Sequence, residues 1–157
     1  MTLKIKTGYR LNVAMIVLNK DNKVLFCKRR NTENWQFPQG GVDENENIES
    51  AMFRELNEEV GLEKDNVEIK AVSQNLIYYD IPKNIRSRVL GGKFRGQAQK
   101  YFLLKHISGD VDLNKENTPE FEKYSWVPFW YPLNQVVDFK KEAYRSALIE
   151  LKNQIKI

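Results

Sequence analysis

The stretch GGVDENENIESAMFRELNEEVGL, residues 40–62, contains the clearest helix signal in the chain. Asn47 is a suitable N-cap for a helix that begins at about Ile48 and ends at Val60. Gly61 followed by Leu62 predicts a left-handed stop at the C-terminal end. One stripe of this helix is apolar, which predicts that it packs on a core; its residues are Met52, Phe53, Leu56 and Val60.

Three carboxylates lie beside this apolar stripe. At about 100° per residue, Glu55, Glu58 and Glu59 share about a third of the helix circumference. Like charges next to a low-dielectric wall repel one another unless cations neutralise them. Oxygen ligands without sulfur or imidazole favour hard cations such as Mg²⁺ or Mn²⁺. An acidic helix face can also simply be solvated, so the helix alone does not decide between these interpretations.

The residues around the helix favour the metal site. The segment fits the pattern G-x5-E-x7-R-E-aliphatic-x-E-E-x-G-aliphatic without a mismatch. Its fixed positions are Gly40, Glu46, Arg54, Glu55, Leu56, Glu58, Glu59, Gly61 and Leu62. This pattern resembles the signature box of the Nudix hydrolases, here residues 40–62.

The box also makes physical sense. Gly40 and Gly41 permit a close turn against the helix, and Glu46 can reach back to the guanidinium fork of Arg54 and lock the loop. The resemblance implies that Arg54 belongs to the catalytic group and that two or more Mg²⁺ or Mn²⁺ ions bind near Gly40 and the last three glutamates. It implies hydrolysis of a phosphoanhydride by metal-activated water, with a nearby carboxylate as base; which glutamate acts as the base stays open.

Strand signals lie on both sides of the box. We expect strands at 13–18, 24–27, 67–79, 99–107 and 124–127 and a C-terminal amphipathic helix through Tyr144, Ala147, Leu148, Leu151 and Ile155. This order predicts an α/β or α+β fold. The resemblance sharpens the expectation to a Nudix-type α/β/α sandwich with a mixed β-sheet, in a single domain spanning residues 1–157.

The amino-acid composition excludes several classes of protein and of catalytic site. One cysteine, Cys27, and one histidine, His106, among 157 residues exclude a disulfide framework and leave little room for Ser-His-Asp catalysis. The net charge of +4 is a cancellation, because residues 41–60 carry a net −6 and residues 81–105 a net +7. This separation predicts a cation site and a polyanion surface. Without an N-terminal signal or a membrane-length apolar run, we expect a cytoplasmic protein that does not bind membranes.

Landmarks outside the box resemble one branch of the family, the bacterial RNA pyrophosphohydrolases and (di)nucleoside polyphosphate hydrolases. These landmarks are Gly8-Tyr9-Arg10, Trp35 to Gly41, Thr118 to Phe121, Trp130-Tyr131-Pro132 and Val136 to Lys140. The resemblance adds Glu120 to the metal-binding and catalytic carboxylates. It implies base stacking on Phe139, which is worth about 1–3 kcal/mol. It implies further substrate contacts at Arg10, Arg29, Tyr79, Gln97, Lys100, Val137 and Lys140.

Three functions remain open at this stage. The first is removal of pyrophosphate from the 5′-triphosphate end of RNA, which leaves a 5′-monophosphate and starts mRNA decay. The second is hydrolysis of diadenosine tetra- or pentaphosphate, which Tyr78 and Tyr79 favour because a tyrosine at this distance from the box marks such enzymes in the family. The third is a non-catalytic RNA-binding module, which the intact glutamates disfavour. We also expect a monomer, with a protein activator as a further partner.

Overall fold

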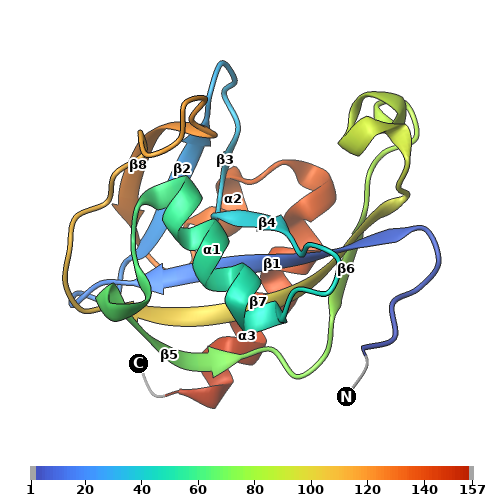
Figure 1. Ribbon diagram of the computed structural model, residues 1–157. Coiled ribbons are helices and arrows are strands. Elements are labelled where there is room, and N and C mark those ends of the chain that lie inside the picture. The colour runs from blue at the N-terminus through green and yellow to red at the C-terminus, as the bar shows by residue number, and fades with distance from the viewer. Residues whose placement is uncertain (1–2, 156–157) are drawn as a thin grey trace.

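Strand β1, Tyr9–Leu18, forms the centre of a mixed eight-stranded sheet in the computed structural model, which describes residues 3–155 (Figure 1). The other strands are β2 (Val24–Arg29), β3 (Trp35–Gln36), β4 (Gln39–Gly41), β5 (Val67–Val72), β6 (Ile77–Asp80), β7 (Gly96–His106) and β8 (Phe121–Val127). The helices are α1 (Ile48–Val60), α2 (Pro132–Gln135) and α3 (Lys141–Gln154), with short 3-10 turns at Lys64–Asn66, Arg86–Arg88, Leu90–Gly92 and Asp138–Lys140.

The sheet is mixed because one pairing is parallel. The main strand order is β3-β2-β1-β7-β5, and β4, β6 and β8 pair with β1, β7 and β2 respectively. Strands β1 and β7 run parallel from the pair Tyr9 and Gly96 to the pair Leu18 and Lys105. All the other pairings are antiparallel.

Both faces of the sheet are covered by helices, and the alternation of β1 shows how. Val13, Met15 and Val17 point into the apolar cluster that contains the buried side of α1. Ala14 and Ile16 point to the other face, into the cluster that α3 completes. Figure 1 shows α1 in front of the sheet and α3 behind it. The expected α/β/α sandwich with a mixed sheet is therefore confirmed.

Helix α1 has the bounds and both ends that the sequence predicts. The Asn47 side chain accepts a hydrogen bond of 3.1 Å from the Ser50 amide. Gly61 ends the helix with a φ of 72°, a left-handed conformation in which a side chain is strained. A Cβ at Gly61 would also lie 2.7 Å from the Asp112 carbonyl oxygen, so a larger residue would displace that neighbouring loop.

The prediction of one continuous strand over 67–79 is wrong. The structure has two strands, β5 and β6, which both pair with β7 but in different registers. At the break, the Ser73 amide donates to the Tyr101 carbonyl, and the Tyr101 amide donates to the Ser73 hydroxyl. The hydroxyl thus takes part in the ladder in place of a backbone carbonyl, which the alternation of apolar residues could not indicate.

The other predicted elements are present. The strands expected at 13–18, 24–27 and 124–127 lie within β1, β2 and β8, and the one expected at 99–107 matches β7 except for Ile107. The apolar stripe from Tyr144 to Leu151 is buried on α3, and Ile155 lies just beyond the end of that helix. Between residues 3 and 155, no helix has the length and apolar character needed to cross a membrane.

Candidate active site

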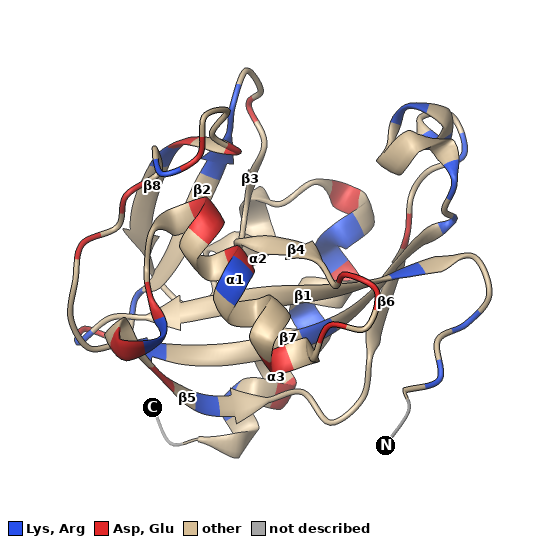
Figure 2. Cartoon of the chain, in the orientation of Figure 1, with Lys and Arg blue, Asp and Glu red and all other residues tan. Residues whose placement is uncertain are grey.

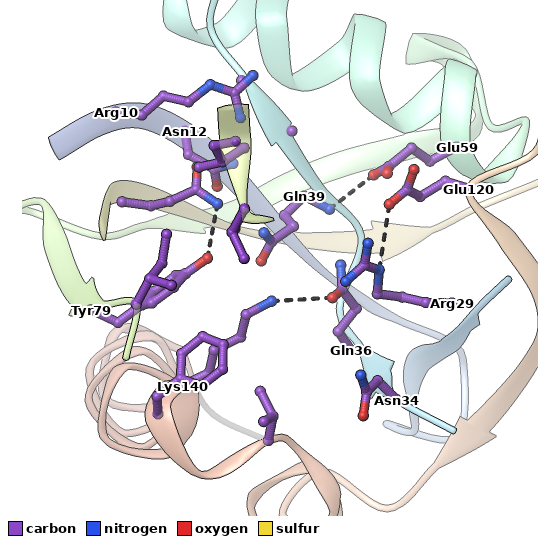
Figure 3. Close-up of a pocket in the computed structure, with 18 of the residues that line it drawn as sticks. Arg10, Asn12, Arg29, Asn34, Gln36, Gln39, Glu59, Tyr79, Glu120 and Lys140 are labelled. Atoms are coloured by element: carbon purple, nitrogen blue, oxygen red, sulfur yellow. Dashed lines mark hydrogen bonds and ion pairs between the residues drawn. The ribbon is translucent and has the colours of Figure 1, made fainter. Parts of the chain in front are cut away.

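A cleft of about 470 Å³ opens beside the sheet, where β1, β4, β6 and β7 meet α1 and the turn before α3. Figure 3 shows carboxylates at one end of this cleft, and Tyr79 and Lys140 at the other. We call these the acidic end and the aromatic end. Each end draws its residues from different parts of the chain, and both contain residues that the sequence predicts for the site.

Three glutamates form the acidic end. Glu55 and Glu59 reach the cleft from α1, and Glu120 reaches it from the residue before β8. Gly40 on β4 lies against Glu55 so closely that a Cβ on the glycine would overlap the glutamate carboxyl group. The glycine is therefore needed to let this carboxylate lie beside the strand.

Arg54 holds the acidic helix and its preceding loop together. Its Nε and Nη2 each donate to a carboxylate oxygen of Glu46 over 2.8 Å, and Nη2 also donates to the Gly41 carbonyl over 2.9 Å. Its Nη1 donates to Glu55 over 2.8 Å and to Glu58 over 3.2 Å. The fork predicted between Glu46 and Arg54 is present, and the same guanidinium also orients two of the predicted metal ligands.

Burial and nearby negative charge raise the pKa of two carboxyl groups at the acidic end, Glu55 and Glu59. Burial raises the pKa of Glu59 well above its usual range, and the nearby charges of Glu55 and Glu120 add to this effect. Burial also raises the pKa of Glu55, although its bond to Arg54 opposes the shift. The Arg54 hydrogen bonds lower the pKa of Glu46 to about 2. Glu46 is thus a fixed anion, whereas the negative charges of Glu55 and Glu59 are unfavourable where these side chains lie.

Such repulsion is what a cation site relieves. Glu59 is 8% exposed, and one of its oxygens accepts a bond of 2.9 Å from the Gln39 amide. In the present side-chain orientations, no three Asp, Glu, His or Cys groups among residues 3–155 are gathered closely enough to hold one ion. The Nη1 bonds of Arg54 account for part of this, because they hold Glu55 and Glu58. The all-oxygen donor set itself suits a hard divalent cation.

The aromatic end combines rings with a buried amine. The Tyr79 and Phe139 ring centroids lie 5.8 Å apart at an angle of 45°. Lys140 is 7% exposed; its Nζ donates to Gln36 over 3.1 Å and lies 5.5 Å from the Tyr79 ring centroid. Burial, with help from the charge of Arg29, lowers the pKa of Lys140 to about 8. This amine is therefore charged at neutral pH and available to an anion.

Gln97 of β7 lies opposite Tyr79 of β6, and both residues line the cleft. The Gln97 Nε2 donates to the Tyr79 hydroxyl over 2.8 Å, while the Gln97 Oε1 is buried without a hydrogen-bond partner among the described residues. A buried polar atom without a partner is costly. Because Gln97 lines the cleft, a bound ligand or a water is the available partner.

Two guanidinium groups also line the cleft. Arg10 lines the cleft from β1, and a Cβ at Gly41 would overlap its guanidinium group. Arg29 ends β2, with its Nε 3.6 Å from a Glu120 oxygen. Guanidinium groups are suited to two-point contacts with phosphate. Figure 3 shows Arg29 beside Glu120, close to the acidic end.

Not every predicted residue faces the cleft. Lys100 donates its Nζ to the Gln74 carbonyl over 3.1 Å and is not among the lining residues. Glu58 and Arg54 also lie outside the lining, although Arg54 contacts Glu55. Val137, like Phe139, lines the cleft.

Several lining residues were not predicted for the site. They are Asn12, Asn34, Trp35, Gln36, Gln39, Ile81, Ile85, Val89 and Leu90. Gln36 and Gln39 belong to the landmark segment 35–41, which was an available signal. Ile85, Val89 and Leu90 interrupt the basic stretch, and their apolar character was the sign that this loop has an inward side.

Residues 8–151 match the family model described as NUDIX domain. A protein of Francisella tularensis subsp. mediasiatica named RNA pyrophosphohydrolase is 48% identical over 152 residues, which make up 96% of this chain and 97% of that protein. Two solved structures share the fold. A MutT protein from Methanosarcina mazei has a TM-score of 0.67 at 17% identity, over 98% of this chain and 100% of that one. A C. elegans Ap4A hydrolase has a TM-score of 0.65 at 21% identity, over 89% of this chain and 97% of that one.

The fold and the site define an α/β sandwich with a carboxylate-rich cleft beside a mixed sheet. With a family match over nearly the whole chain, the chain belongs to the Nudix family.

Proposed function

We propose that this chain hydrolyses phosphoanhydride bonds with the help of divalent cations, and that it removes pyrophosphate from the 5′-triphosphate end of RNA to leave a 5′-monophosphate. The observation that carries the proposal is the continuous cleft that joins the acidic end to the aromatic end. Such a cleft has a place for a polyphosphate and a place for the base that follows it. The relative named RNA pyrophosphohydrolase, 48% identical, supports this substrate.

Glu55, Glu58, Glu59 and Glu120 would hold Mg²⁺ or Mn²⁺, with the Gly40 segment beside them. When bound, the cations neutralise phosphate oxygens and supply a water of lowered pKa. A cation at Glu55 and Glu58 would share these carboxylates with Arg54 Nη1, while Glu46 keeps Arg54 in place through its Nε and Nη2. Arg54 is thus a positioning residue for the acidic helix.

The chain's own side chains do the rest. Arg10 and Arg29 line the cleft where they can bind phosphate oxygens, and the Lys140 amine adds a positive charge next to Tyr79. Phe139 offers a ring on which the leading base stacks. One of the carboxylates that line the cleft, Glu55, Glu59 or Glu120, would take a proton from the attacking water. We expect this reaction in the cytoplasm, where transcripts are made and degraded.

A second function is supported by a specific observation. Tyr79, the residue that suggests a dinucleoside polyphosphate substrate, lines the cleft, whereas Tyr78 contacts Tyr9 and Lys6 instead. Diadenosine tetraphosphate, like a 5′-triphosphorylated RNA end, offers a base, a ribose and a polyphosphate. The cleft is therefore compatible with it as an alternative substrate.

One assay separates these functions. The protein is incubated with Mg²⁺ or Mn²⁺ and, in parallel, with 5′-triphosphorylated RNA, diadenosine tetraphosphate or ADP-ribose, beside a Glu58→Gln variant. We expect pyrophosphate release from RNA and its loss in the variant. Turnover of the dinucleotide with untouched RNA would replace the leading function by the alternative. Equal activity in the variant would contradict the metal-carboxylate mechanism, and RNA binding without any turnover would favour a binding module.

A further inference from the structure

Leu90 stands in a backbone conformation that leucine rarely adopts. It lies in the segment between β6 and β7, residues 82–95, which we call the β6–β7 loop. Its φ is +52°, and the two glycines after it have φ values of +69° and +71°. A left-handed backbone is unfavourable for leucine because its Cβ crowds the next carbonyl oxygen. Strained residues of this kind cluster at ligand clamps and active sites, so the position of the Leu90 side chain is of interest.

The β6–β7 loop has an apolar inner side and a polar outer side. Ile85, Val89 and Leu90 line the cleft and pack in one cluster with Tyr79 and Phe139. The exposed residues of the loop are polar or glycine: Lys83, Asn84, Ser87, Arg88, Gly91, Gly92, Lys93 and Arg95. Figure 2 shows the basic positions along this loop, away from the acidic positions of α1. The inner side thus gives the cleft an apolar surface that the hydrophilic outer side does not share.

The stem of the loop is anchored on both sides. Arg95 Nε donates to Asp80 over 3.0 Å, and the Tyr9 hydroxyl donates to the same carboxylate. Arg86 donates twice to the Ile81 carbonyl, over 3.2 Å from Nε and 2.8 Å from Nη2. The tip projects from the body of the protein in Figure 1, but these bonds fix the direction from which Val89 and Leu90 enter the cleft.

We propose that Leu90 is a specificity-determining residue whose side chain forms, with Val89, an aliphatic wall against the leading base at the aromatic end. The inference rests on the proposed function, because only a nucleotide-bearing substrate brings a base to this end. A flat base presents apolar faces that match an aliphatic wall and an aromatic ring. A phosphate chain would gain nothing from such a wall, so Leu90 distinguishes substrates with a base from those without one.

Two variants test this wall with the backbone strain removed. Leu90→Gly deletes the side chain, and Leu90→Asn keeps a side chain of similar size but makes it polar; both residues tolerate the left-handed conformation. The ligands are α,β-methylene-ATP, which resists cleavage at that bond, and inorganic tripolyphosphate. Dissociation constants are measured by calorimetry with Mg²⁺, and thermal midpoints report the fold. Ser87→Ala, on the exposed side of the same loop, is the matched control.

We expect both Leu90 variants to weaken binding of the nucleotide by about tenfold, to leave tripolyphosphate unchanged and to keep or raise the thermal midpoint. An unchanged nucleotide constant, or an equal loss for both ligands, would overturn the inference. If a Leu90 variant unfolds, Val89→Thr, which keeps the side-chain shape, replaces it in the test. This variant must then weaken binding of the nucleotide but not of tripolyphosphate, or the inference is wrong.

The proposed function is tested by a different measurement from the one that tests the wall. It would appear as the absence of pyrophosphate release from 5′-triphosphorylated RNA by the unchanged protein. A protein that is inactive on RNA but still loses nucleotide binding selectively in the Leu90 variants would contradict the function and support the wall.

Discussion

The two ends of the cleft are built on opposite principles. At the acidic end, negative charges are crowded beside the core. The Arg54 guanidinium group holds Glu46 and Glu55, and the lack of a side chain at Gly40 leaves room for Glu55. At the aromatic end, an apolar cluster with the rings of Tyr79 and Phe139 lies beside one buried amine, that of Lys140. The first arrangement suits any substrate with a polyphosphate. The second can distinguish what that polyphosphate is attached to, so chemistry and selectivity are divided along one cleft.

The largest effect should come from the most crowded carboxylate. Glu59→Gln removes a charge from the acidic end, and we expect turnover of 5′-triphosphorylated RNA to fall by about 10²- to 10⁴-fold. In EDTA, which removes cations, the same substitution should stabilise the folded state although it abolishes most of the activity. Because the pKa of Glu59 is raised above its ordinary 4.5, its charge destabilises the folded state as pH rises past that value.

The thermal midpoint of Glu59→Gln in EDTA should therefore exceed that of the unchanged protein at pH 7, and the gap should close toward pH 4. A variant that is less stable at pH 7 would show that the Glu59 charge is not an unfavourable one. Retained turnover would remove Glu59 from the catalytic carboxylates.

The next largest effect should come from Arg54, which binds Glu46, Glu55 and Glu58 at the acidic end. Arg54→Lys keeps the charge but loses the fork that binds Glu46, and we expect the free energy of unfolding to fall by about 2 kcal/mol. The pKa of Glu46 is lowered to about 2, so its stabilising contribution is complete above 4.5 and is lost as pH falls toward 2. Urea unfolding at pH 7 and pH 3 measures both effects.

Arg145→Lys on α3 is the matched control, because the ion pair of Arg145 with Glu142 is exposed. We expect a change of less than about 0.5 kcal/mol there. Equal losses of unfolding free energy in the two variants would mean that the Arg54 contacts stabilise the fold no more than an exposed ion pair does.

At the aromatic end, the buried amine should produce a stability profile of its own. The pKa of Lys140 is lowered from 10.5 to about 8, so the protonated amine destabilises the fold below pH 8, and this cost disappears as pH rises toward 10.5. The difference in thermal midpoint between Lys140→Met and the unchanged protein should thus shift in favour of the unchanged protein from pH 7 to pH 10. A constant difference would mean that Lys140 titrates as an exposed lysine does.

The smallest effect should come from the outer side of the β6–β7 loop. Replacing both Arg88 and Lys93 with alanine should lower kcat/KM on RNA by about twofold at low salt. It should also reduce the salt dependence, by about 0.7 in the log–log slope for each RNA phosphate that the loop no longer neutralises. Lys20→Ala with Lys23→Ala, in the turn after β1, is the control. Equal salt slopes in both double variants would exclude a directed role for the loop's positive charge.

The sequence predicted the two ends unequally, for a physical reason. Glu55, Glu59, Arg54 and Gly40 lie within one contiguous box, so helical spacing and capping rules place them relative to one another. Val89 and Phe139 meet only through the tertiary fold, and no local periodicity joins a loop at 82–95 to a turn at 138–140. Phe139 was predicted through family resemblance, whereas the loop residues were missed.

The same distinction explains the one wrong prediction in the fold, the continuous strand over 67–79. The ends of α1 follow from Asn47 and Gly61, whose effects are local. The break between β5 and β6 depends on Ser73 bonding to Tyr101, a partner 28 residues away that no window of the sequence contains. Lys100 is assigned to the substrate by resemblance alone; its amine donates to the Gln74 carbonyl outside the cleft lining, and its role stays a prediction.

The parallel pairing of β1 with β7 has a consequence for the growing chain on the ribosome. Tyr9 is joined to Gly96 and Leu18 to Lys105, so the first strand leaves the exit tunnel long before its partner. Contacts of such large sequence separation form slowly, and unpaired strands are prone to aggregation. Because Glu120 and Phe139 are translated later still, both ends of the cleft are completed only as synthesis nears its end, and we expect nascent chains to be inactive toward nearby transcripts.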